Sequence, residues 1–262
     1  LGFNLDRSTL KLNGLLEQRG DSPTDRERIT ADLISGNVRA QSDQQSTTRK
    51  NWEIGGDYEY EVDSNSRFRV LFIVNDRNST YDRIRYDVSD QELSPNLFLE
   101  RLSRDRERIV RTSFTRNLTE KQGLELGAEG AQTIRDSDLK MGLDTPGVPN
   151  ESYGNLVPVS VDNSKSTVQE IRYEPFTIYN WQINDRMSLE SRLLYETSTI
   201  EQTGDVSRER SFSFVKPRID YRYNLTQSFQ VRLEVERDIS QLSFSDFSTS
   251  VDSNDEEKNT FS

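Results

Sequence analysis

Carboxylates are the side chains that this sequence offers in quantity for chemistry. Its 262 residues include 45 Asp and Glu and 34 Lys and Arg, but no His and no Cys. A pair of carboxylates can serve as general acid and base. A Ser-His-Asp triad, a Cys-His pair and a His-ligated zinc or haem site each need residues that are missing. Because no spacing singles out one carboxylate pair, we expect solvated strand faces and no enzymatic activity.

Two acidic segments have the residue types of a cation site. Asp136-Ser137-Asp138 begins like a calcium-binding loop, but Lys140 takes the place of the third oxygen ligand and the glycine of the sharp turn is missing. The acidic run from Asp252 to Glu257 is explained more simply as a solvated loop. We therefore predict an ordinary polar loop in both places, with a loop-bound cation as the alternative. We predict no metal, no cofactor and no catalytic residue.

The charge and composition exclude some classes of partner and of fold. The net charge is −11 and no basic patch is interleaved with aromatic residues, so we expect no binding of nucleic acid. Apolar residues make up 32% and charged residues 30%, which is lean for a packed core but sufficient for one curved sheet with a single apolar face. No stretch approaches ~20 consecutive apolar residues, the length of a transmembrane helix.

The clearest pattern lies between Ser211 and Ser240. Apolar side chains alternate there with charged or polar ones: Ile219, Tyr221 and Tyr223 against Arg218, Asp220 and Arg222, then Phe229, Val231, Leu233 and Val235 against Gln230, Arg232, Glu234 and Glu236. Alternation with period 2 predicts two β-strands, each with an apolar and a charged face. The link at residues 224–228 is short and polar, so we expect an antiparallel hairpin. The charged face would line a wet lumen and contact a plug or a solute, while the apolar face requires a sheet, a helix layer or lipid.

The same unit of strand, tight polar turn, strand and longer polar stretch recurs along the chain. The tight turns are predicted near Asp6, Asn65, Asn117, Asp185 and Thr226. The longer stretches at residues 20–50, 76–111 and 136–165 are predicted to be loops that face outside. For residues 24–50, the alternative to a loop is an extension of a strand. For residues 92–111, the alternatives are a helix and a strand that rises above a membrane. Within one predicted strand, the Gly55-Gly56 pair indicates a kink or close packing.

Short connections at one end and long ones at the other are typical of transmembrane β-barrels. Aromatic residues gather beside the tight turns, where a ring with a polar tip fits a lipid–water boundary. We predict an all-β fold: a transmembrane, antiparallel, up-and-down β-barrel, partial with about ten strands, short periplasmic turns and long extracellular loops. The alternative, a soluble β-sandwich, would have strands every ~8–12 residues. Successive tight turns lie about 40 to 65 residues apart, which favours the barrel.

Two segments resemble the barrel hairpins of TonB-dependent outer-membrane receptors. They run from Phe214 to Thr226 (FVKPRIDYRYNLT) and from Tyr179 to Glu196 (YNWQINDRMSLESRLLYE), and the resemblance extends over residues 50–250. It implies a barrel of about 22 strands in the outer membrane of a Gram-negative bacterium, closed inside by an N-terminal plug domain. Such receptors import siderophores, cobalamin, sugars or similar scarce nutrients, with energy supplied through a TonB-binding segment.

The resemblance also sets the expected domain organisation and partners. Residues 1–262 are expected to be one part of an outer-membrane barrel domain, without a plug domain. The implied partners are membrane lipids, lipopolysaccharide, the plug domain, the TonB complex and a nutrient substrate. Two other functions stay open: a soluble β-rich module that binds carbohydrate or protein, and a barrel that serves as a structural component of an envelope assembly.

Overall fold

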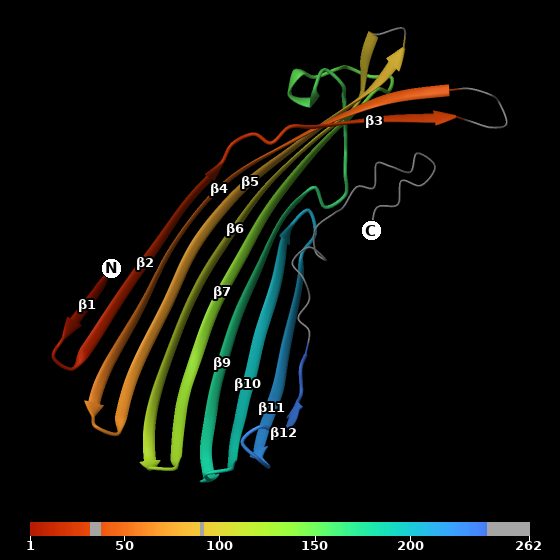
Figure 1. Cartoon of the computed structure of the whole chain (residues 1–262). Coiled ribbons are helices and arrows are strands. Elements are labelled where there is room, and N and C mark those ends of the chain that lie inside the picture. The colour runs from red at the N-terminus through yellow and green to blue at the C-terminus, as the bar shows by residue number, and fades with distance from the viewer. Residues whose placement is uncertain (32–37, 90–91, 240–262) are drawn as a thin grey trace.

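One antiparallel sheet contains every strand in the described part of the chain (Figure 1). The structure is a computed structural model that describes residues 1–31, 38–89 and 92–239; the acidic run from Asp252 to Glu257 lies outside these ranges. The strands are β1 (Gly2–Leu5), β2 (Ser8–Arg19), β3 (Thr24–Ala31), β4 (Val38–Asp63), β5 (Ser66–Ser89), β6 (Glu92–Thr119), β7 (Gln122–Leu143), β8 (Val157–Val159), β9 (Lys165–Asn184), β10 (Met187–Gly204), β11 (Arg208–Asn224) and β12 (Gln230–Glu236). A 3-10 helix, η1 (Glu151–Tyr153), lies between β7 and β8. Within the same ranges, no helix is long and apolar enough to cross a membrane.

The sheet is an up-and-down meander. Its order is β1-β2-β4-β5-β6-β7-β9-β10-β11-β12, with β3 beside β4 and β8 beside β7. The predicted tight turns join β1 to β2, β4 to β5, β6 to β7, β9 to β10 and β11 to β12, and Figure 1 shows them along the lower side of the sheet. The predicted all-β, antiparallel, up-and-down architecture is thus confirmed, with β1 and β12 as the edges of the described sheet.

Side chains in four tight turns fix the backbone locally. Each accepts a hydrogen bond from the backbone N–H two residues further on: Asp63 at 2.8 Å and Asn184 at 2.9 Å through side-chain oxygens, and Thr119 at 3.2 Å and Thr226 at 3.3 Å through hydroxyls. Short polar side chains stabilise turns in this way. This is the physical reason why Asp, Asn and Thr mark the hairpin ends in the sequence.

Several strands extend much further from the tight turns than the sequence predicts. β4, β5 and β6 contain 26, 24 and 28 residues. The predicted loops at residues 20–50 and 76–111 are therefore wrong over most of their described length, and the strand extension proposed for residues 24–50 is correct. The helix alternative for residues 92–111 is wrong as well, since they lie in β6.

Residues 41–51 of β4, 75–80 of β5 and 103–108 of β6 escaped prediction because polar side chains occupy both faces of the strands there. These stretches lack the apolar alternation that marks a half-buried strand. Cross-strand ion pairs accompany the backbone ladder instead: Arg83 pairs with Asp43, and Lys140 lies 2.6 Å from Glu100. Alternation therefore detects only the part of each strand that has an apolar face.

Residues 136–165 form a loop only in part. β7 continues to Leu143 and β9 begins at Lys165, so Asp136-Ser137-Asp138 lies within β7 and the polar loop predicted there is wrong. In a strand, Asp136 and Asp138 point to one face and Ser137 to the other. The segment therefore does not wrap around a point as a calcium-binding loop does.

The connection that remains, residues 144–164, packs against the sheet. The Tyr153 ring of η1 lies edge-on to Phe98 of β6, with 6.5 Å between ring centroids, and β8 pairs with the end of β7. Val161 then joins a small apolar cluster that includes Leu97. The end of the sheet opposite the tight turns thus has a core of its own.

Nearer the tight turns, the sheet has one apolar and one charged face. We call the apolar face the outer face; it carries Leu12, Ile54, Tyr58, Val70, Phe72, Val110, Leu126, Tyr179, Leu193, Ile219, Val231, Leu233 and Val235. These side chains are not sealed in a core, since Leu193 is 48% exposed and Leu233 is 58% exposed. We call the outer-face residues within 11 residues of the tight turns the apolar band.

Aromatic residues mark both borders of the apolar band. Tyr60, Phe68 and Trp181 lie close to the tight turns, as the sequence predicts. The sequence analysis missed a second border, where Trp52 and Tyr173 each lie 11 residues from the tight-turn end of their strand and are exposed. Tyr60 and Trp52 are eight residues apart on β4, as are Trp181 and Tyr173 on β9, which is slightly fewer than the ~9–11 residues of a strand that crosses a bilayer.

Close packing explains the Gly55-Gly56 pair. Gly56 lies opposite Phe72 on β5, and a Cβ atom at Gly56 would overlap the Phe72 ring. Gly55 points to the other face, where the Asn13 amide occupies the corresponding space. Pairing with β2 and β5 continues without a register shift through both glycines. Close packing is therefore the correct one of the two predicted roles.

We expect Gly56→Ala to destabilise the fold, because the added methyl group must displace the Phe72 ring. The free energy of unfolding, measured by denaturant titration of the full-length protein, should fall by about 1–3 kcal/mol. Gly14→Ala is the matched control, since the nearest atom to its Cβ would be the Glu53 carbonyl oxygen at 3.7 Å. Equal losses for the two variants would contradict this account of the glycine pair.

Candidate functional site: a polar hollow on the inner face

The charged face is concave near the tight turns. A hollow of about 940 Å³ is lined there by residues of β6, β7, β9, β10 and β11 and by Asn65 of the turn before β5. Strands that are not neighbours in the sheet border one hollow, so the sheet curves around the charged face. We call this face the inner face.

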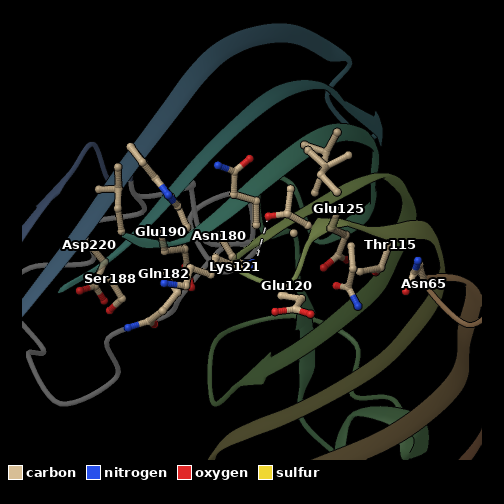
Figure 2. A pocket seen from close by; sticks show the side chains of 18 of the residues that line it. Asn65, Thr115, Glu120, Lys121, Glu125, Asn180, Gln182, Ser188, Glu190 and Asp220 are labelled. Carbon is tan, nitrogen blue, oxygen red and sulfur yellow. Dashed lines mark hydrogen bonds between the residues drawn. The ribbon is translucent and has the colours of Figure 1, made fainter. Parts of the chain in front are cut away.

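Hydrogen-bonding side chains line the hollow (Figure 2). Hydroxyl, amide and carboxylate groups come from Thr115, Ser188, Asn180, Gln182, Glu120, Glu125, Glu190 and Asp220. Such a wall suits a polar protein segment or a polar solute, which can exchange water for these groups. Over the described ranges, no group of three or more His, Cys, Asp or Glu side chains is placed to hold a metal ion.

Asp220 is the most enclosed charge in this wall. It is 3% exposed and lies between Arg222 and Arg232, whose Nη2 atoms are 2.8 and 2.7 Å from its Oδ2 atom. Charge-assisted hydrogen bonds of this kind restrain both partners. The carboxylate therefore holds two guanidinium groups in fixed positions on the inner face, and both remain partly open to solvent.

The charged residues of β11 and β12 that were predicted to share one face do lie together, and they pair with one another. Besides the Asp220 cluster, Arg218 lies 2.6 Å from Glu234 and 3.7 Å from Glu236. The same arrangement recurs on other strands: Arg69 pairs with Asp57 at 2.5 Å, Arg172 with Glu129 at 3.5 Å, and Lys216 with Glu196. These pairs neutralise one another within the sheet, and the neutral amides and hydroxyls of the hollow remain available to a partner alongside charged groups such as Glu120 and Glu190.

Sequence reasoning did not single out Thr115, Glu125, Asn180 and Glu190. They belong to four strands, and only the strand register brings them together. A usable signal was nevertheless present. Each residue is in the charged phase of the alternation and lies within four residues of the tight-turn end of its strand.

A second charged cluster lies beyond the apolar band, on β4 and β5. Arg39 donates to Asp87 through Nε at 2.9 Å and Nη2 at 3.1 Å, and the Gln41 amide donates to the same carboxylate at 3.2 Å. Hydrogen bonds from Arg39, with smaller contributions from Asn96 and Gln41, lower the pKa of Asp87 to about 2. The cluster therefore stays charged over the whole physiological pH range.

Acid should remove the stabilisation that Asp87 provides. An unfolded Asp has a pKa of ~3.9, whereas folded Asp87 has a pKa of about 2. The contribution is therefore fully present above the unfolded value and is lost as the pH falls through the folded value. We expect the wild-type protein to unfold at higher denaturant concentration than Asp87→Asn at pH 6, and the difference to be small at pH 2 and to vanish below it. Arg39→Gln should reproduce this behaviour, and a difference that stays constant with pH would contradict it.

Comparison with solved structures confirms the fold. No protein-family model matches the chain, and no curated protein matches it. The ferric citrate transporter FecA in its unliganded form is similar, with a TM-score of 0.50 and 11% sequence identity over 87% of this chain and 36% of that chain. The copper transporter OprC has a TM-score of 0.42 and 12% identity over 85% of this chain and 39% of that chain. The chain thus spans little more than a third of the length of these transporters. The barrel-type fold implied by the resemblance to TonB-dependent receptors is confirmed.

Proposed function

We propose that this chain is part of the barrel of a TonB-dependent transporter in the outer membrane of a Gram-negative bacterium. The observation that carries the proposal is the apolar band. Its apolar side chains are exposed or partly exposed, they lie on one face of the sheet, and they occupy the residues of each strand nearest the tight turns. On β4 and β9 the aromatic residues that border the band are eight residues apart, close to the ~9–11 residues of a strand that crosses a bilayer, and aromatic residues at both borders are typical of transmembrane barrels.

The two ends of the sheet define its orientation in this proposal. The tight turns lie in the periplasm, and the long polar ends of β4, β5, β6 and β7 extend outside the cell. β1 and β12 are edges of the described sheet, and a bilayer does not tolerate unpaired backbone groups at such edges. Further strands therefore complete the barrel.

The inner hollow is the proposed contact surface for the plug domain. Plug residues would bond to neutral groups such as Thr115 and Asn180 and to the guanidinium groups that Asp220 holds in place. The plug in turn would respond to the TonB complex. The transported nutrient belongs, by the resemblance, to the siderophore, cobalamin or glycan class.

The two competing functions, a soluble binding module and an enzyme, each require a feature that differs from those described above. A soluble binding module needs a second layer over the apolar face, yet Leu193 and Leu233 are about half exposed or more. An enzyme that uses a carboxylate pair needs acidic groups free to exchange protons, whereas inner-face carboxylates such as Asp220 and Glu234 are held by arginines. We therefore propose transport without catalysis.

Placing the same charge on opposite faces of the sheet tests the proposal. Leu193→Lys puts a cation into the apolar band and should destabilise the membrane-inserted protein by about 2–4 kcal/mol. Leu15→Lys is the control, because Leu15 is 52% exposed on the inner face and lies opposite Glu53; it should have little effect. Denaturant titration in lipid vesicles measures both. If Leu193→Lys is harmless, the outer face meets water and the membrane proposal fails.

A further inference from the structure

An arginine-rich surface covers the inner face beyond the apolar band. It begins at the row in which Arg19 of β2 lies opposite Arg49 of β4, and it extends to the far ends of β3, β4, β5 and β6. We call this surface the arginine face. Five of its arginines make no ion pair within the described part of the chain: Arg19, Arg26, Arg28, Arg49 and Arg101.

Carboxylates are too few on the arginine face to balance its arginines. Three further arginines have partners there: Arg39 with Asp87, Arg83 with Asp43, and Arg85 with the neutral amide of Asn96. Glu92, which lies opposite Ser89, is the third carboxylate of this face among the described residues of β2 to β6. Eight arginines thus face three carboxylates, in a chain whose net charge is −11. An anionic partner is the natural complement of such a surface.

The other acidic residues at this level of the strands belong to the outer face. Asp21, in the connection before β3, accepts a hydrogen bond from the Ser46 hydroxyl of the outer face. Strand alternation also points four carboxylates outward: Asp25, Glu27, Asp82 and Glu100. The sheet therefore separates these carboxylates from the arginine face.

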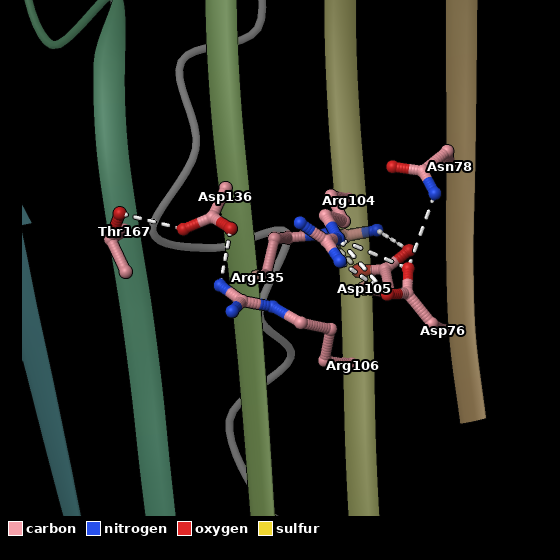
Figure 3. A network of polar contacts seen from close by, with 8 residues as sticks. All are labelled: Asp76, Asn78, Arg104, Asp105, Arg106, Arg135, Asp136 and Thr167. Atoms are coloured by element: carbon pink, nitrogen blue, oxygen red, sulfur yellow. Dashed lines mark hydrogen bonds and ion pairs between the residues drawn. The ribbon is translucent and has the colours of Figure 1, made fainter. Parts of the chain in front are cut away.

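Arginines nearer the membrane are neutralised within the sheet, as Figure 3 shows. Three of them donate hydrogen bonds to carboxylates: Arg104 to Asp76, Arg106 to Asp136, and Arg135 to Asp105. An excess of unpaired guanidinium groups is thus not a general property of these long strands. It is confined to the arginine face.

The arginine face is a long and narrow strip. From Arg39 to Arg49 it extends over ten residues of β4, which corresponds to ~33 Å at ~3.3 Å per residue. Across the sheet it covers only β2 or β3, then β4, β5 and β6, which is ~14 Å at ~4.8 Å between neighbouring strands. A small anion would contact two or three guanidinium groups of this strip, whereas an extended polyanion would contact most of them.

The side chains of the strip favour carboxylates and sugar hydroxyls. Its cations are all arginines, whose planar guanidinium groups can bind both oxygens of a carboxylate. Neutral side chains that exchange hydrogen bonds with sugar hydroxyls lie between them: Thr24, Gln45, Thr47 and Ser79. Single-stranded nucleic acid needs aromatic rings on which its bases stack. The aromatic residue of this face among the described residues of β2 to β6 is Tyr81, and the Arg101 guanidinium already lies over its ring at 5.6 Å.

We propose that the arginine face binds an extended acidic oligosaccharide, in which a carboxylate recurs from sugar to sugar as in a chain of uronic acids. The inference deepens the proposed function and rests on it, since it narrows the transported nutrient to acidic glycans. In the proposed orientation, the arginine face lies outside the cell and faces the barrel axis. The oligosaccharide therefore meets the arginines before it reaches the plug.

The test compares probes that differ in charge or in length. The full-length protein is incorporated into phosphatidylcholine nanodiscs, which leave both ends of the barrel accessible, and binding is measured by isothermal titration calorimetry. The probes are an oligomer of galacturonic acid long enough to span the strip, its neutral methyl ester, the single sugar and single-stranded DNA. We expect the acidic oligomer to bind at least tenfold more tightly than each of the other three.

Matched variants locate the binding surface. Arg26→Gln/Arg28→Gln should weaken binding of the acidic oligomer about tenfold, and Arg101→Gln about threefold, as expected for the loss of exposed ion pairs with the ligand. Arg108→Gln is the control on the same strand as Arg101. Arg108 is likewise exposed, but it lies on the outer face and bonds to the neutral amide oxygen of Gln132 at 3.2 Å. This control should bind like the wild type.

The possible results separate this inference from the proposed function. Insertion is read independently, by co-elution of the protein with the nanodiscs. An inserted protein that binds the acidic oligomer no more tightly than its methyl ester, or that prefers DNA, would overturn the oligosaccharide site and leave the transporter proposal standing. Equal losses in Arg101→Gln and Arg108→Gln would also overturn the site. A protein that binds the acidic oligomer but does not insert would overturn the transporter proposal alone.

Discussion

Backbone N–H and C=O groups in a bilayer must be satisfied within the protein, because lipid offers no hydrogen-bonding partners. The sheet meets this constraint through long, nearly uninterrupted ladders. β4 and β5 pair from Ala40–Val88 to Asp63–Ser66 with one register shift, next to the tight turn. Once the ladder satisfies the backbone, only the side chains need to match their surroundings. A single apolar face is then sufficient, which explains why 32% apolar residues can support such a large structure.

The inner face is charged, so its side chains must stay ordered while they remain in contact with water. Ion pairs such as Arg69–Asp57 and Arg218–Glu234 join neighbouring strands across it. Each exposed pair contributes only ~0–1 kcal/mol, so these pairs are not the main source of stability. Their consequence is that many charges of the wall already have a partner within the sheet.

The sequence predicts two parts of this fold: the strand segments whose apolar and polar side chains alternate, and the turns whose side chains bond to their own backbone. Alternation of Ile219, Tyr221 and Tyr223 with charged residues marks a strand, and Asp63 and Asn184 mark turns because their side chains bond to the turn backbone. Residues 41–51 of β4, 75–80 of β5 and 103–108 of β6 were missed because polar side chains occupy both faces of the strands there. Pro175 lies in β9, a central strand, whose pairing with β10 is interrupted at Glu174 and Pro175. The inner hollow required the register of five strands, which no local pattern contains.

Contact between the outer face and lipid can be measured residue by residue. The chain has no native Cys, so a single Cys introduced at each position from Val215 to Tyr223 can carry a spin label without interference. Collision rates with oxygen, which dissolves in lipid, and with a water-soluble nickel complex then report each environment. The account predicts a period of two, with Val215, Ile219 and Tyr221 accessible to oxygen and the intervening positions accessible to the nickel complex. Outer-face positions closed to both reagents, as in a packed core, or open to nickel, as in water, would contradict it.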